Sequence, residues 1–254
     1  SRHCTGPGKG IAEACNGMLL IQVNKNILQK WYKSTLVPDI CNKLCRQIPV
    51  IHNSFLSNMY VIPFSPMEKR LTAFINSINR ELFTGPREQN ITGLCYDSRY
   101  ASTGSLFFAL PGLHTDGKRF IDDAVKRGAT TVIYEGELSR LHPGVSYIRV
   151  KNSRSAMSTL SAAFFDHPSR ELTVIGVTGT DGKSTTVSFI YQLLQACGMH
   201  SGFLSTVQFN TGGAAGHNYL RQSTPEAPEI HGLLAEMRDN GVKYAAVEAT
   251  SHGI

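Results

Sequence analysis

Apolar and polar residues alternate in short blocks between residues 67 and 170, and their period switches between that of helices and that of strands. Helical spacing of the apolar positions predicts helices at 68–75, 120–127 and 153–165. Short apolar runs bounded by turn residues are typical of strands, and they lie at 91–96, 105–110, 130–134 and 146–150. Strands and helices in turn predict a small α/β domain.

The pattern from residue 171 onward opens with an apolar run that leads directly into a glycine-rich turn and a helix over 187–196. It continues with a predicted strand at 202–209, a helix at 225–239 and a strand of the fully buried type at 244–249. We therefore predict an α/β fold class, in which the small α/β domain is followed by a mostly parallel sheet. Because its elements are few, we expect this second domain to be truncated.

The glycine-rich turn is the most informative stretch of the chain. Its glycines let the main chain approach an anion, and the helix that follows directs N–H groups at it. Lys183 can reach terminal phosphates, and Ser184 can offer a hydroxyl to Mg²⁺. The turn therefore predicts an ATP site, whose residues are Gly179, Thr180, Asp181, Gly182, Lys183, Ser184 and Thr185. The standard phosphate-loop pattern has glycine where this chain has Val177, which leaves a glycine turn without ligand as the alternative.

The first 66 residues differ from the rest in charge, cysteine content and patterning. They hold seven Lys or Arg and two acidic residues, and so carry +5 of the formal net charge of +6. Four of the six cysteines lie there too, at Cys4, Cys15, Cys41 and Cys45. Met67 precedes the first clean amphipathic helix. We therefore expect residues 1–66 to be an extension outside the native fold, and 67–170 and 171–254 to be the two domains.

The composition after residue 66 excludes several classes of protein. Its 18 basic and 17 acidic residues nearly balance, so we expect no nucleic-acid-binding surface. No run of about 18 uncharged apolar residues occurs, so we expect no membrane span. Cys95 and Cys197 stand apart from other cysteines, beside a phosphate loop, which indicates reduced thiols in a cytoplasmic protein.

Four motifs follow one another after residue 90. Asp97-Ser98-Arg99 and the stretch 104–117 form the first, and the turn at Gly176–Thr186 is the second. Ser223-Thr224-Pro225-Glu226 is the third, and Val247–Gly253 is the fourth. Together they resemble the Mur ligase family of peptidoglycan synthesis, and the last two are more similar to its MurE type than to its MurF type.

The resemblance implies a UDP-linked substrate that binds loops of both domains. The residues at the matching positions are Tyr96 (through its backbone), Ser98, His114, Thr115, Asp116, Gln222, Ser223, Thr224 and Ser251. The residue types alone leave alternatives open: Ser98 suits a strand-end cap, and residues 114–116 suit a solvated turn.

Glu248 ends the buried strand at 244–249, at the edge where open α/β sheets bind ligands. A role in binding Mg²⁺ would explain a carboxylate at this edge, and Ser184 is a predicted ligand of the same ion. His252 is a candidate further ligand, and the alternative is that it is a structural histidine. Lys183, Glu248 and His252 are thus the predicted catalytic residues. Asp181 stands where the family usually has Asn, and its charge repels a triphosphate unless Lys183 or Mg²⁺ offsets it.

The resemblance implies ATP-dependent amide formation in the cytoplasm, within cell-wall biogenesis, cell shape and cell division. The D-glutamyl carboxylate of UDP-MurNAc-L-Ala-D-Glu takes the γ-phosphate, and a diamino acid, by default meso-diaminopimelate, displaces phosphate from the acyl phosphate. We expect a monomer without nucleic-acid or membrane partners. Because the family's later parts fall beyond residue 254, we expect this piece alone not to ligate. The alternatives are a MurF-type or folylpolyglutamate-synthetase-like ligase, or a UDP-sugar-binding module without catalysis.

Overall fold

The computed structural model describes residues 12–15, 18–23, 68–112, 115–213, 216–217 and 225–249. The chain divides into two compact units. We call Ile62–Ser169 with Pro225–Glu236 the five-strand unit, and Ser1–Val61 with Arg170–Thr224 and Met237–Ile254 the loop unit. Parallel pairs dominate the central strands of both main sheets, which confirms the predicted α/β fold class.

The five-strand unit is built on a sheet of order β4-β9-β8-β7-β6, in which only the edge strand β4 runs antiparallel to its neighbour. Its strands are β4 (Leu82–Thr84), β6 (Gly93–Cys95), β7 (Ser105–Phe108), β8 (Thr131–Tyr134) and β9 (Ser146–Arg149). A separate two-stranded pair joins β3 (Lys69–Arg70) to β5 (Asn90–Ile91). Its helices are α3 (Leu71–Phe74), η1 (Ile75–Ser77), η2 (Ser98–Tyr100), η3 (Gly117–Phe120), α4 (Ile121–Lys126) and α5 (Ser153–Phe164).

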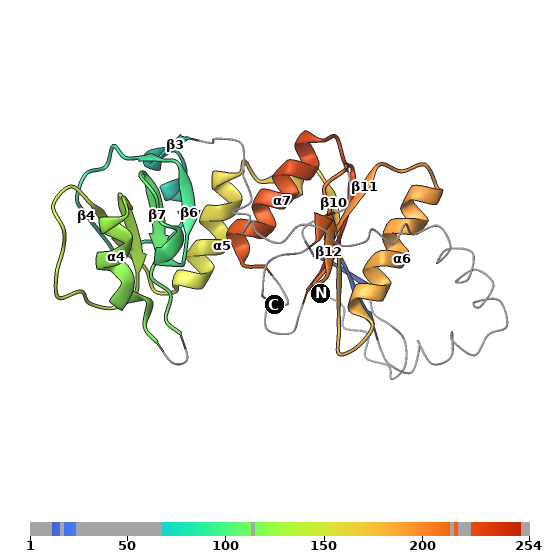
Figure 1. Ribbon diagram of the computed structural model, residues 1–254, viewed down its shortest axis with the longest axis horizontal. Helices are drawn as coiled ribbons and strands as arrows, with labels where there is room; N and C mark the ends of the chain where they lie inside the picture. Colours follow the sequence, from blue (N-terminus) through green and yellow to red (C-terminus); the bar gives the residue numbers. More distant parts are fainter. Residues whose placement is uncertain are drawn as a thin grey trace, which may run out of the picture. The chain divides into compact units, whose positions relative to one another are not determined.

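Both faces of this sheet are covered, and Figure 1 shows α4 and α5 on opposite sides of it. Successive side chains of a strand point to opposite faces. Leu106 and Phe108 accordingly join the core cluster under α3 and α5, whereas Phe107 joins the cluster under α4. All four residues of β7 and of β8 are buried. The apolar runs predicted as strands are thus buried on both sides, as expected of parallel strands.

The loop unit contains a seven-stranded sheet of order β1-β2-β10-β14-β11-β12-β13. Its strands are β1 (Ala12–Cys15), β2 (Met18–Val23), β10 (Thr173–Gly179), β11 (Ser201–Leu204), β12 (Gln208–Asn210), β13 (Gly216–His217) and β14 (Tyr244–Glu248). Strands β2, β10, β14 and β11 run parallel. Helix α6 (Lys183–Ala196) packs on this sheet through a small cluster of Val177, Val187, Phe203 and Ala246.

Two features of the loop unit differ from the sequence-based expectation. Strands β1 and β2 come from the segment that we expected to lie outside the fold, and β2 pairs with β10 from Met18 to Val23. The six-residue run of β2 is mostly apolar, which suits a strand inside a parallel sheet. In addition, the strand predicted at 202–209 is broken by a turn at 205–207 into β11 and the antiparallel β12.

Helix α7 (Ala227–Asp239) contributes its first ten residues to the five-strand unit and its last three to the loop unit. The 3₁₀ turn η4 (Pro168–Arg170) lies where the chain passes between the units. Cys95 and Cys197 are free thiols, and burial raises the pKa of Cys95 to about 12. No helix in the described part of the chain has the length and apolar character needed to cross a membrane.

Candidate functional site

The predicted phosphate loop connects β10 to α6 through a backbone that needs glycine. Gly182 has φ of +76° and caps the N-terminus of α6, a left-handed conformation that a β-carbon would strain. The helix starts at Lys183, four residues before its predicted start, so the first turn contains Lys183, Ser184 and Thr185. The N–H groups of this turn therefore lie at the end of a strand, in the arrangement that binds anions.

The side chain of Lys183 folds over the loop. Its Nζ donates to the carbonyl oxygens of Gly179, at 2.9 Å, and Thr180, at 3.3 Å. Asp181 is exposed at the tip of the loop. The ammonium group thus lies beside the backbone that would surround a phosphate, where it can offset phosphate charge.

Three parallel strands bring distant residues together at one edge of the sheet. Strand β10 ends at the loop, β14 ends at Glu248, and β11 ends just before Ser205 and Thr206. The Ser184 hydroxyl donates to Glu248 Oε2 at 2.8 Å, and the Thr206 amide donates to the same oxygen at 3.1 Å. The structure therefore joins two predicted residues, Ser184 and Glu248, and adds Thr206, which sequence reasoning missed.

Glu248 is a buried carboxylate, 5% exposed. The groups that bond it are a hydroxyl and an amide, and in the described part of the chain no basic side chain forms an ion pair with it. Its position at the N-terminal turn of α6 offsets part of its charge. A buried carboxylate that lacks a cationic partner is stabilised by a bound cation.

The donor atoms at this edge fit Mg²⁺. Magnesium takes oxygen ligands and is usually held by one or two carboxylates together with substrate phosphates, and Ser184 and Glu248 supply a hydroxyl and a carboxylate. Among the described residues, no three His, Cys, Asp or Glu side chains group as a metal site. Ser184 and Glu248 are thus two described residues whose oxygens could hold such a cation.

The five-strand unit places its predicted residues at the carboxyl ends of neighbouring parallel strands. Ser98 is buried directly after β6, in η2. Thr115 and Asp116 follow β7, where the Gly112 amide donates to the Thr115 carbonyl at 3.2 Å. Because β6 and β7 are parallel neighbours, these residues share one edge of the sheet.

Two aspartates in these motifs cap short helices. The Asp97 carboxylate accepts from the Arg99 amide and guanidinium, which lowers the pKa of Asp97. Asp116 accepts from the Lys118 amide at 2.9 Å, and its carboxylate lies 3.3 Å from Lys118 Nζ. Asp116 therefore has a local structural role of the kind that the turn alternative predicts.

The Tyr96 side chain has a partner of its own, which the sequence did not reveal. Its hydroxyl donates to Glu229 Oε1 at 2.9 Å. Burial, followed by the nearby Glu229 charge, raises the pKa of Tyr96, and burial also raises the pKa of Glu229. The predicted role of Tyr96 through its backbone is separate from this contact and stays a prediction.

Six predicted site residues lie outside the described residues. They are His114, Gln222, Ser223, Thr224, Ser251 and His252. Their roles stay predictions.

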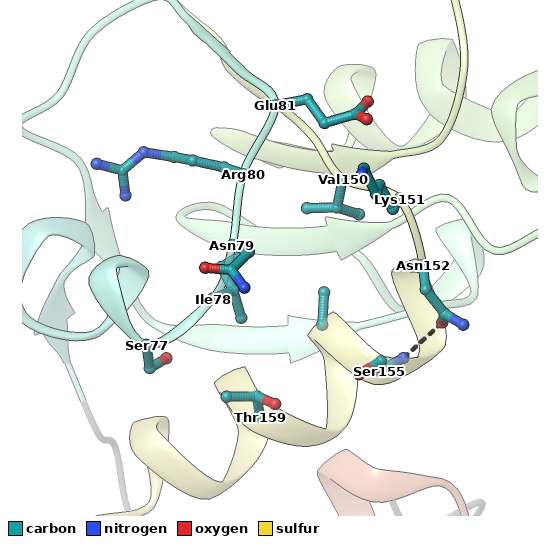
Figure 2. A pocket seen from close by; sticks show the side chains of 11 residues that line it. Ser77, Ile78, Asn79, Arg80, Glu81, Val150, Lys151, Asn152, Ser155 and Thr159 are labelled. Atoms are coloured by element: carbon teal, nitrogen blue, oxygen red, sulfur yellow. Dashed lines mark hydrogen bonds between the residues drawn. The ribbon is translucent and has the colours of Figure 1, made fainter.

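A pocket of about 550 Å³ in the five-strand unit contains none of the predicted residues (Figure 2). It is lined by Ser77, Ile78, Asn79, Arg80, Glu81, Val150, Lys151, Asn152, Ser155, Ala156 and Thr159. The α5 amides beside it are already bonded, Ser153 to Glu135 and Ser155 to Asn152. Because these donors are satisfied, the helix N-terminus offers little to an anionic ligand, and we assign no function to this pocket.

Comparison with known proteins finds family matches to two regions of the chain. The Mur ligase catalytic domain matches residues 90–165, and the Mur ligase middle domain matches residues 177–254. These two regions belong to the Mur ligase family. The match to the middle domain starts at Val177 and includes both the loop and Glu248, the two sides of the site described above.

Curated relatives of these Mur ligase regions carry tripeptide synthetase and ligase names. The chain is 45% identical over 184 residues to the UDP-N-acetylmuramyl-tripeptide synthetase of Treponema denticola, covering 72% of this chain and 34% of the relative. It is 33% identical to the UDP-N-acetylmuramoyl-L-alanyl-D-glutamate--2,6-diaminopimelate ligase of Clostridium tetani, covering 73% and 38%. The chain thus spans about a third of the length of these relatives.

A solved structure of a UDP-N-acetylmuramoyl-L-alanyl-D-glutamate--2,6-diaminopimelate ligase has the same fold over much of the chain. The TM-score is 0.56 at 23% identity, and the match covers 71% of this chain and 36% of that one. This likeness establishes the fold and leaves the function to the site residues.

Proposed function

We propose that this chain is part of an ATP-dependent ligase of peptidoglycan precursor synthesis. In this proposal the loop unit binds ATP with Mg²⁺, and the five-strand unit binds the UDP end of a muramoyl-peptide substrate. The observation that carries the proposal is the meeting of Ser184 and Glu248, 2.8 Å apart, beside a glycine-rich loop that positions Lys183. A loop that merely turned the chain would have no need of a buried carboxylate from a strand 64 residues away.

The residues of the loop unit have distinct roles in this proposal. Lys183 leaves the loop carbonyls to contact terminal phosphates, and the first-turn amides of α6 surround them. Ser184 and Glu248 hold the cation, which supplies charge neutralisation on the phosphates when bound. Because phosphoryl transfer depends mainly on positioning and on offsetting charge, these groups suffice to direct the γ-phosphate toward a carboxylate of the second substrate.

We propose UDP-MurNAc-L-Ala-D-Glu as that second substrate, with a diamino acid, by default meso-diaminopimelate, as the amine. The tripeptide synthetase and diaminopimelate ligase names of the relatives support this choice. Ser98, Thr115 and Asp116 are the described residues proposed to face the substrate, and His114, Gln222, Ser223, Thr224 and Ser251 extend this set. A cytoplasmic location and a monomeric state stay predictions.

Calorimetry on the 254-residue chain tests the proposal. We expect ATP to bind more tightly with Mg²⁺ than without it, and UDP-MurNAc-L-Ala-D-Glu to bind independently. A UDP-sugar-binding module without catalysis would bind the second ligand and ignore ATP with Mg²⁺. Phosphate release with both ligands and meso-diaminopimelate tests the separate prediction that this chain does not ligate alone, since turnover would refute it.

A further inference from the structure

Thr206 lies at the loop site without belonging to any motif that points to the site. It follows β11 and comes within hydrogen-bonding distance of both Ser184 and Glu248. Its amide donates to Glu248 Oε2 at 3.1 Å, and its Oγ1 lies 3.3 Å from Ser184 Oγ. One residue thus contacts both side chains proposed to hold the cation.

The turn that carries Thr206 is held by its own hydrogen bonds. The Ser205 amide donates to the Gln208 carbonyl at 2.9 Å, and the Ser205 hydroxyl donates to the same carbonyl at 2.8 Å. The Ser205 hydroxyl also accepts from the Gln208 amide at 3.1 Å. Residues 205–208 are therefore fixed locally, so the position of Thr206 does not depend on its contact with Glu248.

The hydrogen count at the site defines the direction of each bond. Ser184 has a single hydroxyl proton, and it is donated to Glu248, because a carboxylate only accepts. The Ser184 oxygen therefore accepts from the Thr206 hydroxyl. Thr206 closes a ring in which its hydroxyl bonds Ser184, Ser184 bonds Glu248, and Glu248 accepts from the Thr206 amide.

The spacing of the oxygens is that of neighbouring magnesium ligands. Ligands at about 2.0–2.1 Å from Mg²⁺ in octahedral geometry lie about 3 Å from one another. Ser184 Oγ lies 2.8 Å from Glu248 Oε2 and 3.3 Å from Thr206 Oγ1, one value on either side of this spacing. Both separations from Ser184 Oγ therefore suit neighbouring ligands of one cation.

We propose that Thr206 is part of the cation site: its amide positions Glu248, and its hydroxyl is a third oxygen directed at the Mg²⁺ that accompanies ATP. This inference rests on the proposed function of the loop unit. It extends that function to the β11–β12 turn and to a residue that neither the phosphate loop nor the strand ending in Glu248 contains.

The test is the Mg²⁺ concentration required for half-maximal ATP binding by the full 254-residue chain, measured by calorimetry at fixed ATP. Thr206→Val keeps the amide and the shape but removes the hydroxyl, and we expect it to require about tenfold more Mg²⁺. Thr206→Ser keeps both groups and should remain within about twofold of the wild type. The neighbouring Val207 is 61% exposed, so Val207→Ala is the matched control and should change nothing.

A second readout separates a cation role from a general effect on the loop. Affinity for ATP in EDTA should be the same in wild type and Thr206→Val, because the proposed role of the hydroxyl in ATP binding is exerted through the cation. Circular dichroism checks folding, and Thr206→Ala carries the same expectation if the valine variant does not fold. The proposed role of Thr206 is overturned if the folded variant has an unchanged Mg²⁺ requirement, or if it loses ATP affinity equally with Mg²⁺ and in EDTA. Either result leaves the proposed function of the loop unit standing. A wild-type chain whose ATP binding does not respond to Mg²⁺ overturns the proposed function as well.

Discussion

The two units differ in where their apolar and polar side chains lie. In the five-strand unit, β7 and β8 are buried along their whole length, and separate apolar clusters cover the two faces of the sheet. In the loop unit, α6 has one buried residue, Val187, while Phe189 and Leu193 are 45% and 66% exposed. A buried carboxylate and two hydroxyl side chains meet at the edge of its sheet.

This difference indicates that the units are stabilised in different ways. Apolar burial supplies most folding free energy, and among the described residues it is concentrated in the five-strand unit. The loop unit uses its strand ends to hold polar groups for a ligand, and a ligand that binds only the folded state stabilises that state. We therefore expect ATP with Mg²⁺ to increase hydrogen-exchange protection in β10 and α6 more than in β7 and β8.

The largest expected effect is on the packing of the five-strand unit. Phe107 is fully buried, and Phe107→Ala should lower the free energy of unfolding by about 3–5 kcal/mol because it leaves a cavity. Phe189→Ala is the matched control in the loop unit, and at an exposed site it should stay within about 0.5 kcal/mol of the wild type. Hydrogen exchange resolved by segment measures both, and equal losses would contradict the contrast between the units.

Lys183→Met tests the charge of the loop unit. It should weaken ATP binding more than 100-fold, about 3 kcal/mol, because the ammonium group no longer contacts the phosphates. Calorimetry measures the loss, and circular dichroism should show an unchanged fold. Lys126→Met removes an exposed lysine from α4, so the account fails at this point if that variant loses ATP binding to the same degree.

His231 gives the five-strand unit a pH dependence. Burial, and then the nearby His167, lowers the pKa of His231 from 6.5 to about 4. Between these values the unfolded chain takes up a proton that the folded chain does not, so stability present above pH 6.5 should fall by about 3 kcal/mol as the pH drops to 4. His231→Gln should remove this decline in urea denaturation. His200→Gln, at an exposed position in the loop unit, should leave the decline in place.

The smallest effect concerns the Tyr96–Glu229 hydrogen bond. Tyr96→Phe removes the donor and leaves a partly buried carboxylate oxygen without it, which should cost about 1 kcal/mol of stability. Because this contact lies within the five-strand unit, ATP affinity should not change. Tyr134→Phe removes a hydroxyl from a buried tyrosine of the same unit, and an equal loss there would show that the Glu229 contact is not the cause.

Much of the fold could be predicted from the sequence, because its signals are local. Short, mainly apolar runs predicted β7 and β8, and the strand–glycine–lysine–serine order predicted the loop. Glu248 was placed at a ligand-binding edge by one rule, that open α/β sheets bind ligands at the carboxyl ends of their strands, and the structure shows its contact with Ser184. The predicted domain boundaries stay predictions.

Other features depend on contacts between distant residues, and local patterns do not contain them. Thr206 was missed because residues 202–209 have the composition of one strand. The turn stabilised by Ser205 interrupts this strand and places the Thr206 amide against Glu248. The Tyr96–Glu229 contact joins residues 133 positions apart. The pairing of β2 with β10 was missed because the change in charge and cysteine content near residue 66 was given more weight than one apolar run.

The most direct test of the account is a calorimetric titration of ATP into wild type and Glu248→Gln over a range of Mg²⁺ concentrations. Glutamine keeps an acceptor for Ser184 and Thr206 but removes the charge that a cation requires. We expect the variant to bind ATP in EDTA as the wild type does and to lose most of the gain in affinity that Mg²⁺ provides. The same Mg²⁺ dependence in both proteins would contradict the assignment of a cation to this edge of the sheet.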